Sequence, residues 1–247
     1  MQQHSEKMTG KIILIAGGTS PVGLGVVRFF LEQDATLIVP AKSLTEINRL
    51  KGNITDIESG TLITQLTELP DYDSGFDIAE TIVERFGKID IGIAIFNGMP
   101  CNRELTELHI SDWQNMMDNE VTPFFVCARL ILHTMKENSE GLYISLCDSS
   151  LLKQENSCPL SKIAANVKME MSKIFADETK KHNVKYYHLL VDQNVKGQLT
   201  TDCGEYTSVV SSEMIGTRIQ QLYFCKAARP EDIFQLFQEN NTHPDNN

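Results

Sequence analysis

Glycine and hydroxyl residues gather in the stretch that follows a short apolar run at residues 12–16. Side chains at helical spacing come directly after them, so a strand, a tight turn and a helix are expected in that order. Ser20 suits the N-cap of this helix, and Pro21 suits its first position. Glycines let backbone N–H groups approach a diphosphate closely, and the helix dipole favours an anion there. The stretch therefore predicts a phosphate site, with a tight connection that binds no ligand as the alternative. The expected phosphate-binding residues are Gly17, Thr19, Ser20, Val22 and Gly23.

Net charge, apolar runs and cysteine spacing restrict the binding partners and the cellular location that we expect for this protein. A formal charge of −11 disfavours nucleic acids and anionic membrane surfaces as partners. No apolar run approaches the roughly 20 residues that span a membrane, and the first residues lack the apolar core of a signal peptide. The six cysteines are dispersed, which is typical of reduced thiols in a cytoplasmic protein. Asp71, Asp73 and Asp77 lack the glycine and glutamate spacing of a calcium loop, so no metal site is expected.

Apolar runs alternate with helical stretches along most of the chain, which predicts an α/β fold: a doubly wound parallel sheet in a single domain over residues 10–238. Residues 1–9 are expected to be flexible, and residues 239–247 to be disordered. Residues 51–60 are interpreted as a loop or an inserted hairpin. Strands are expected at residues 12–16, 36–39, 61–66, 90–96, 142–146 and 184–191. Helices are expected at residues 21–30, 43–50, 78–86, 112–119, 122–136 and 161–181, with a short one from Pro230. In the longest of these helices, the apolar stripe consists of Ile163, Val167, Met171, Ile174 and Phe175.

Four motifs in this order resemble those of the short-chain dehydrogenase/reductase family. They are GGTSPVG at residues 17–23, ERFGKID at 84–90, WQNMMDNEVTPFF at 113–125 and RPEDI at 229–233. The resemblance covers roughly residues 10–238. It implies a Rossmann-like fold, a nicotinamide dinucleotide as cofactor and a proton-transfer site at the carboxyl ends of the strands.

The resemblance also implies where the catalytic groups lie. The family has a tyrosine and, four residues later, a lysine on the long helix, with a serine after the fifth strand and an asparagine on an earlier helix. Aligned on these positions, Lys162 matches the lysine, and Cys158 stands where the tyrosine belongs. Asp148 stands at the serine position and Glu120 at the asparagine position. Three of the four polar groups have therefore changed type.

These changes predict impaired hydride chemistry. A thiol at Cys158 is a weak hydrogen-bond donor and is shorter than a phenol by most of a ring. A carboxylate at Asp148 cannot donate to a developing alkoxide, and its charge opposes that alkoxide. A shift of register by one residue would put Cys147 or Ser149 at this position instead. Two carboxylates beside Lys162 would form an ion-pair cluster that occupies its ammonium group.

Cofactor binding is expected to survive in altered form. Pro21 replaces the family's middle glycine, but the amide of Val22 still offers a donor to a diphosphate. Lys42 follows the second strand, where the family uses an acid to hold the ribose of NAD. Its charge suits a 2′-phosphate, which favours NADP(H) over NAD(H), with a solvated surface lysine as the alternative. Asn97 and Lys162 complete the expected cofactor contacts.

The end of the chain bears on assembly. A helix expected at residues 233–238 leaves no candidate for the family's closing strand, which helps to build one interface of tetrameric members. We therefore expect a homodimer formed through the helices at residues 122–136 and 161–181. The alternative is that these two helices only cover the sheet.

The sequence thus predicts an NAD(P)-binding protein with a degenerate Tyr/Ser/Asn site and weak or no oxidoreductase activity. One alternative is an active NADPH-dependent carbonyl reductase that uses Lys162 with Asp148 or Cys158. Another is a cofactor-free module for protein interaction. No substrate is predicted, because the pocket residues lie in loops, above all residues 193–213.

Overall fold

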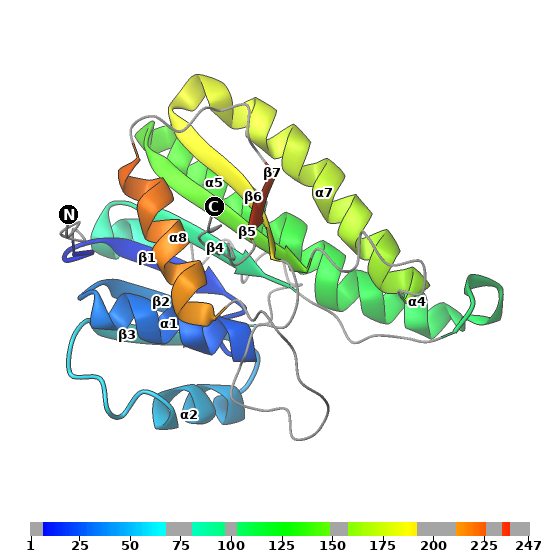
Figure 1. Ribbon diagram of the computed structural model, residues 1–247, viewed down its shortest axis with the longest axis horizontal. Helices are drawn as coiled ribbons and strands as arrows, with labels where there is room; N and C mark the ends of the chain where they lie inside the picture. Colours follow the sequence, from blue (N-terminus) through cyan, green and yellow to red (C-terminus); the bar gives the residue numbers. More distant parts are fainter. Residues whose placement is uncertain are drawn as a thin grey trace, which may run out of the picture.

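Parallel strands form one sheet at the centre of the molecule, in the order β3-β2-β1-β4-β5-β6-β7 (Figure 1). The computed structural model describes residues 7–67, 81–96, 103–148, 158–191, 211–225 and 234–237. Every strand pair in the sheet is parallel, as the alternation of strands and helices predicts. The strands are β1 (Ile12–Ala16), β2 (Thr36–Ala41), β3 (Thr61–Leu66), β4 (Ile91–Ile95), β5 (Gly141–Asp148), β6 (Val184–Val191) and β7 (Phe234–Phe237).

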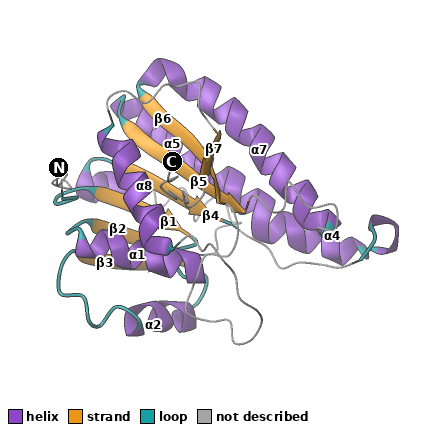
Figure 2. Cartoon of the chain, viewed as in Figure 1, coloured by secondary structure: helices purple, strands orange, loops and turns teal. Residues whose placement is uncertain are grey.

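Helices cover both faces of this sheet, with α1 and α8 on one side and α5 and α7 on the other (Figure 2). Alternate residues of β1 serve the two layers, since Ile13 and Ile15 pack with α1 and α8 while Ile12 and Leu14 pack with α5. The predicted doubly wound α/β fold is confirmed. The described residues 81–86 are helical, within the helix expected at 78–86. The labelled helical segments are α1 (Pro21–Glu32), α2 (Leu44–Gly52), η1 (Leu105–Glu107), α4 (Ile110–Met116), the π-helical turn η2 (Met117–Val121), α5 (Thr122–Asn138), α7 (Pro159–Thr179), η3 (Lys180–His182) and α8 (Ser212–Phe224).

The buried face of helix α7 overlaps only in part with the apolar stripe that the sequence predicts. Its buried residues are mostly small and polar: Leu160, Ser161, Ala164, Ala165, Lys168, Ser172, Ala176 and Thr179. Within the expected stripe, Val167 and Ile174 are exposed, and Ile174 keeps 55% of its surface. Small side chains let the helix lie close to β6, while Ile163, Met171 and Phe175 pack at the border of the buried face.

The carboxyl-terminal part of the sheet corrects the expected helix at residues 233–238. Residues Phe234–Phe237 form strand β7, which pairs with β6 from His188 to Val191. The expected loss of the closing strand is therefore wrong, because pairing with the free edge of β6 overrides the local helical pattern. Helix α8 was not expected. It packs on α1 so closely that a Cβ built at Gly25 would lie 2.1 Å from the Cβ of Ser212.

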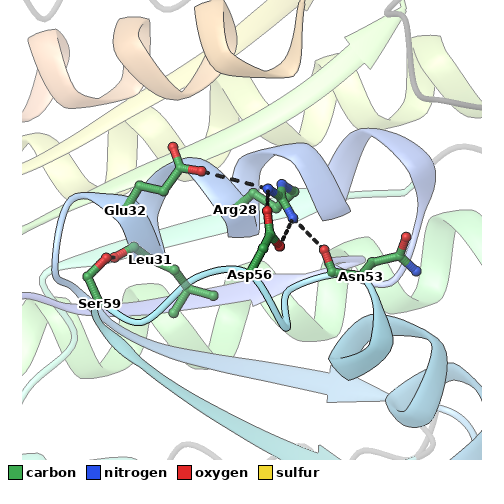
Figure 3. A network of polar contacts seen from close by, with 6 residues as sticks. All are labelled: Arg28, Leu31, Glu32, Asn53, Asp56 and Ser59. Carbon is green, nitrogen blue, oxygen red and sulfur yellow. Dashed lines mark hydrogen bonds and ion pairs between the residues drawn. The ribbon is translucent and has the colours of Figure 1, made fainter.

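The segment after α2 forms turns and contains no strand, so the loop interpretation of residues 51–60 is confirmed over the hairpin. Arg28 of α1 holds this loop through two hydrogen bonds to the carboxylate of Asp56, of 2.8 and 2.6 Å (Figure 3). The hydroxyl of Ser59 donates to the carbonyl of Leu31 at 2.9 Å. The hydrogen bond from Arg28 lowers the pKa of Asp56 to about 2.

At the start of the chain, Met8 is fully buried, although residues 1–9 were expected to be flexible. Its amide donates to the carbonyl of Gln33 at 2.9 Å. The packed part of the chain therefore begins at least as early as Met8. Residues 1–6 and the tail at 239–247 lie outside the described residues.

Candidate functional site

The glycine turn joins β1 to α1 with the geometry that the sequence predicts. Gly17 has a φ of +82°, and a Cβ there would lie 2.1 Å from the carbonyl oxygen of Ile95, so only glycine fits. The hydroxyl of Ser20 accepts from the amide of Gly23 at 3.0 Å and donates to the carbonyl of Gly17 at 2.8 Å. Ser20 is thus the N-cap, as predicted, and its hydroxyl is already engaged. The amide of Val22, in the first turn, has no intrahelical acceptor and faces the end of the helix where an anion is favoured.

The loop after β2 meets this turn through side chains of α2. The Oε2 atom of Glu46 accepts from the backbone amide of Lys42 at 3.1 Å and from the hydroxyl of Thr19 at 3.3 Å. Arg49 donates to the carbonyl of Thr19 at 2.9 Å. The ammonium of Lys42 donates to Asn119 at 3.0 Å. The expected cofactor residues Thr19 and Lys42 are therefore brought together by Glu46, and Arg49 of the same helix adds a second cation beside the turn.

A buried ion pair that the sequence did not suggest lies at the carboxyl end of β4, between this strand and α7. Lys168 of α7 is 2% exposed, and its ammonium donates to the carbonyl of Phe96 at 2.6 Å and to Glu120 at 3.4 Å. Glu120 is 4% exposed and lies in the π-helical turn η2, whose extra residue per turn separates α4 from α5. The pair ties the end of β4 to α7 and to this turn.

The expected pairing of Glu120 with Lys162 is therefore wrong. Lys162 is exposed, because it lies six residues from Lys168 on a helix that turns by about 100° per residue. Cys158 is buried at the N-cap of α7, in an apolar cluster that includes Met116. The proposed catalytic pair of Cys158 and Lys162 thus places one group in the core and the other in solvent.

The end of β5 carries the remaining expected group. Asp148 is the half-buried last residue of this strand, beside the end of β6. Its neighbour Cys147 is buried, and burial raises the pKa of the thiol, an effect that the charge of Lys168 opposes. A buried protonated thiol is a poor nucleophile. Asn97 and Ser149 lie outside the described residues, as do Asp71, Asp73 and Asp77, where no metal site is expected.

Hydrogen bonds extend from the ion pair of Lys168 and Glu120 into the core between the sheet and α7. The hydroxyl of Ser172 donates to the carbonyl of Lys168 at 2.8 Å and lies 3.1 Å from Nδ1 of His188. The hydroxyl of Ser145 lies 2.6 Å from the same nitrogen, and Tyr186 donates to Ser172 at 2.9 Å. Burial, followed by the charge of Lys168, lowers the pKa of His188 to about 3. The histidine is therefore neutral at physiological pH and joins β5, β6 and α7 as a structural group.

Two signals in the sequence point to groups that were missed. Lys168 belongs to the small-residue stripe at helical spacing on α7, which marks the packed face. Glu46 stands three residues after the N-cap Ser43, a position from which a side chain reaches back to the start of its helix.

A family model described as short chain dehydrogenase matches residues 11–190. The match covers most of the chain, and the chain belongs to this family. Among curated relatives, a 3-oxoacyl-acyl-carrier-protein reductase, FabG, of Chlamydia pneumoniae is 24% identical over 239 residues, which are 93% of this chain and 88% of that protein. An uncharacterized oxidoreductase of Listeria monocytogenes, Lmo0432, is 27% identical over 44% of this chain and 43% of its own length.

Solved structures share the fold at lower identity. An alcohol dehydrogenase of Thermococcus sibiricus, complexed with 5-hydroxy-NADP, superposes with a TM-score of 0.77 at 15% identity, over 96% of this chain and 99% of that one. The L-sorbose reductase of Gluconobacter frateurii, complexed with NADPH and L-sorbose, gives a TM-score of 0.66 at 18% identity, over 77% and 72% of the two chains. Among the helices of the described ranges, none combines the length and the apolar character that crossing a bilayer requires.

Proposed function

We propose that this protein binds a nicotinamide dinucleotide, NAD(P)(H), at the carboxyl edge of its sheet and has weak or no oxidoreductase activity. The observation that carries this proposal is a contrast between the glycine turn after β1 and the expected proton-transfer positions near α7. The glycine turn keeps the close packing at Gly17 and the capped helix start that a diphosphate needs. Near α7, the proton-transfer positions hold a buried thiol and a carboxylate that is committed to an internal lysine.

The chemistry of these positions supports the second part of the proposal. Cys158 packs in an apolar cluster, and a thiol there offers no strong donor to a substrate oxygen. Asp148 would oppose the negative charge that develops on that oxygen during carbonyl reduction. Lys162, the expected partner of the proton donor, has an exposed side chain.

An activity assay tests this part of the proposal. The protein is incubated with NADPH or NADH and a panel of ketones and quinones, and oxidation of the cofactor is followed by its absorbance. We expect no turnover above that of the Lys162→Ala variant. Turnover that survives Cys158→Ala but disappears in Lys162→Ala would instead support a working, non-standard reductase.

The form of the cofactor is a finer question. Lys42 alone favours NADP(H), and Arg49 adds a second cation on α2. Glu46 lies between these cations and the turn, where its charge opposes a 2′-phosphate. The two cations thus favour NADP(H) and Glu46 opposes it, so the choice between NADP(H) and NAD(H) depends on Glu46.

We also propose a homodimer through α5 and α7. Phe125 is 42% exposed on α5, and the centroid of its ring lies 6.1 Å from that of Phe175 on α7, the helix that also exposes Val167 and Ile174. A shallow pocket of about 240 Å³ between these helices is lined by cationic groups of α5, among them Arg129, and by Glu178 of α7. A two-fold axis across this face would bury the apolar side chains and set the charges of α5 against those of the second α7. In the part of the chain that the structure describes, Cys127, Cys147 and Cys225 form no disulfide, which supports the cytoplasm as the proposed location.

A further inference from the structure

Two hydrogen-bond donors converge on a single carboxylate oxygen beside the glycine turn. The backbone amide of Lys42 donates to Oε2 of Glu46 at 3.1 Å, and the hydroxyl of Thr19 donates to the same atom at 3.3 Å. Glu46 is only half-exposed, and its backbone amide donates to the hydroxyl of the N-cap Ser43 at 3.2 Å, which fixes the first turn of α2. The chain thus supplies the anion that these donors hold.

Two cations lie beside this carboxylate but bind neutral acceptors. Arg49 donates to the carbonyl of Thr19 at 2.9 Å, and Lys42 donates to the side-chain oxygen of Asn119 at 3.0 Å. Both cationic side chains belong to exposed residues, so either can turn towards a new anion at little cost. An amide, a hydroxyl and two cations form a set of groups that suits a phosphate.

The position of this set relates it to the ribose of a dinucleotide. Thr19 belongs to the turn that would hold the diphosphate, and Lys42 directly follows β2. In a doubly wound sheet, the adenosine ribose of a dinucleotide lies near the end of the second strand, within reach of an acid or an arginine. Glu46 reaches this place from the first turn of α2, although no acid stands at the strand end itself.

We infer that Glu46 is a specificity-determining residue that selects against a phosphate on the 2′-hydroxyl of the adenosine ribose. The inference rests on the proposed binding of a dinucleotide at this edge. A free ribose hydroxyl donates to the unused lone pairs of the carboxylate, so the unphosphorylated dinucleotide fits the arrangement as it stands. A 2′-phosphate carries two negative charges or nearly so and must displace Glu46 from the Lys42 amide and the Thr19 hydroxyl. Once Glu46 is neutral or absent, Lys42 and Arg49 serve the phosphate.

The test compares Glu46→Gln and Glu46→Ala with the wild type by calorimetric titration. The probes are adenosine 2′,5′-bisphosphate and AMP, which isolate the ribose end, together with NADPH and NADH. Glu58→Gln is the matched control, because it removes the same charge from an exposed residue before β3, at the opposite edge of the sheet. Thermal denaturation of each variant verifies that it is folded.

We expect Glu46→Gln to tighten the binding of the bisphosphate and of NADPH about tenfold at low ionic strength. The variant removes the repulsion between the carboxylate of Glu46 and a 2′-phosphate a few ångströms away. The binding of AMP and NADH should stay unchanged or weaken, and the gain should shrink as salt is added. Glu58→Gln should change none of these affinities by more than about twofold.

Equal changes for the phosphorylated and unphosphorylated probes would overturn the role of Glu46 while leaving dinucleotide binding intact. Binding of NADPH that appears only in the Glu46 variants would support it. Failure of all four probes to bind both the wild type and Glu46→Ala would overturn the proposed function itself, and the role of Glu46 with it.

Discussion

The buried ion pair of Lys168 and Glu120 should contribute to the stability of the fold, and removing its charge tests this. Lys168→Met keeps the length of the side chain but removes its ammonium group. It leaves the carboxylate of Glu120, which is 4% exposed, without a counter-charge in the core. It also removes the donor to the carbonyl of Phe96 at the end of β4.

The expected loss of stability is large. Removing one member of a buried ion pair costs about 3–5 kcal/mol, because the remaining charge stays desolvated. For a chain of this size, each kcal/mol lowers the melting temperature by about 2–4 °C, so a fall of about 10 °C is expected. The double variant Lys168→Met/Glu120→Leu should recover most of this loss, leaving about 1 kcal/mol for the unpaired carbonyl of Phe96.

Urea denaturation is measured for the wild type, the single variants Lys168→Met and Glu120→Leu, and the double variant. The four free energies of unfolding form a double-mutant cycle that gives the coupling energy of the pair. Lys173→Met is the matched control on the same helix, since Lys173 pairs with Glu170 in solvent at 2.7 Å. It should change the free energy of unfolding by less than about 0.5 kcal/mol. A cost for Lys168→Met as small as that of the control, or a double variant less stable than both single ones, would refute the reasoning.

Three further outcomes are expected. Burial lowers the pKa of His188 to about 3, so below about pH 6.5 the unfolded state binds a proton that the folded state does not. The free energy of unfolding should therefore fall as the pH drops from 6.5 towards 3, and urea denaturation of His188→Gln at several pH values should show a shallower fall. Gly17→Ala should lower the melting temperature far more than Gly10→Ala, because both have positive φ but only a Cβ at Gly17 meets backbone atoms. If α5 and α7 form a dimer interface, Ile174→Glu should halve the mass measured by light scattering, whereas Leu44→Glu, at a residue of α2 that is at least as exposed, should leave it unchanged.

The parts of the fold that local signals determine could be read from the sequence. The strand, turn and cap around Ser20 follow from residue types within one short stretch, and the structure has them as expected. The same holds for β3, whose bounds at residues 61–66 match the expected strand. Local propensity and tertiary context agree at these places.

Other features depend on partners far away in the chain. Strand β7 exists because β6 offers a free edge to residues Phe234–Phe237, which carry a helical pattern on their own. The packed face of α7 is set by how closely it approaches β6, so its small residues turn inward and Ile174 stays exposed. Hydrophobic periodicity alone identifies only part of the packed face there, since Met171 and Phe175 pack against the core but Val167 and Ile174 do not.

The candidate site shows the same division. The glycine turn was predicted as a phosphate site from its residues, and that role still awaits a binding measurement. Lys168 was missed because a lysine on a helix is normally a surface residue. Glu46 was missed because the expected acid belongs at the strand end, whereas this one arrives from the first turn of α2. The small-residue stripe of α7 and the position of Glu46 after its N-cap are local signals, but the partners of both groups lie on other elements.

Calorimetric titration of the wild-type protein with NADH and NADPH tests the central claim most directly. The account predicts one site per chain for at least one of the two dinucleotides, without cofactor oxidation when ketones or quinones are added. No heat from either dinucleotide up to millimolar concentration, in the wild type and in Glu46→Ala alike, would contradict cofactor binding. Rapid oxidation of bound NADH or NADPH that depends on Lys162 would contradict the claim that the site has lost its chemistry.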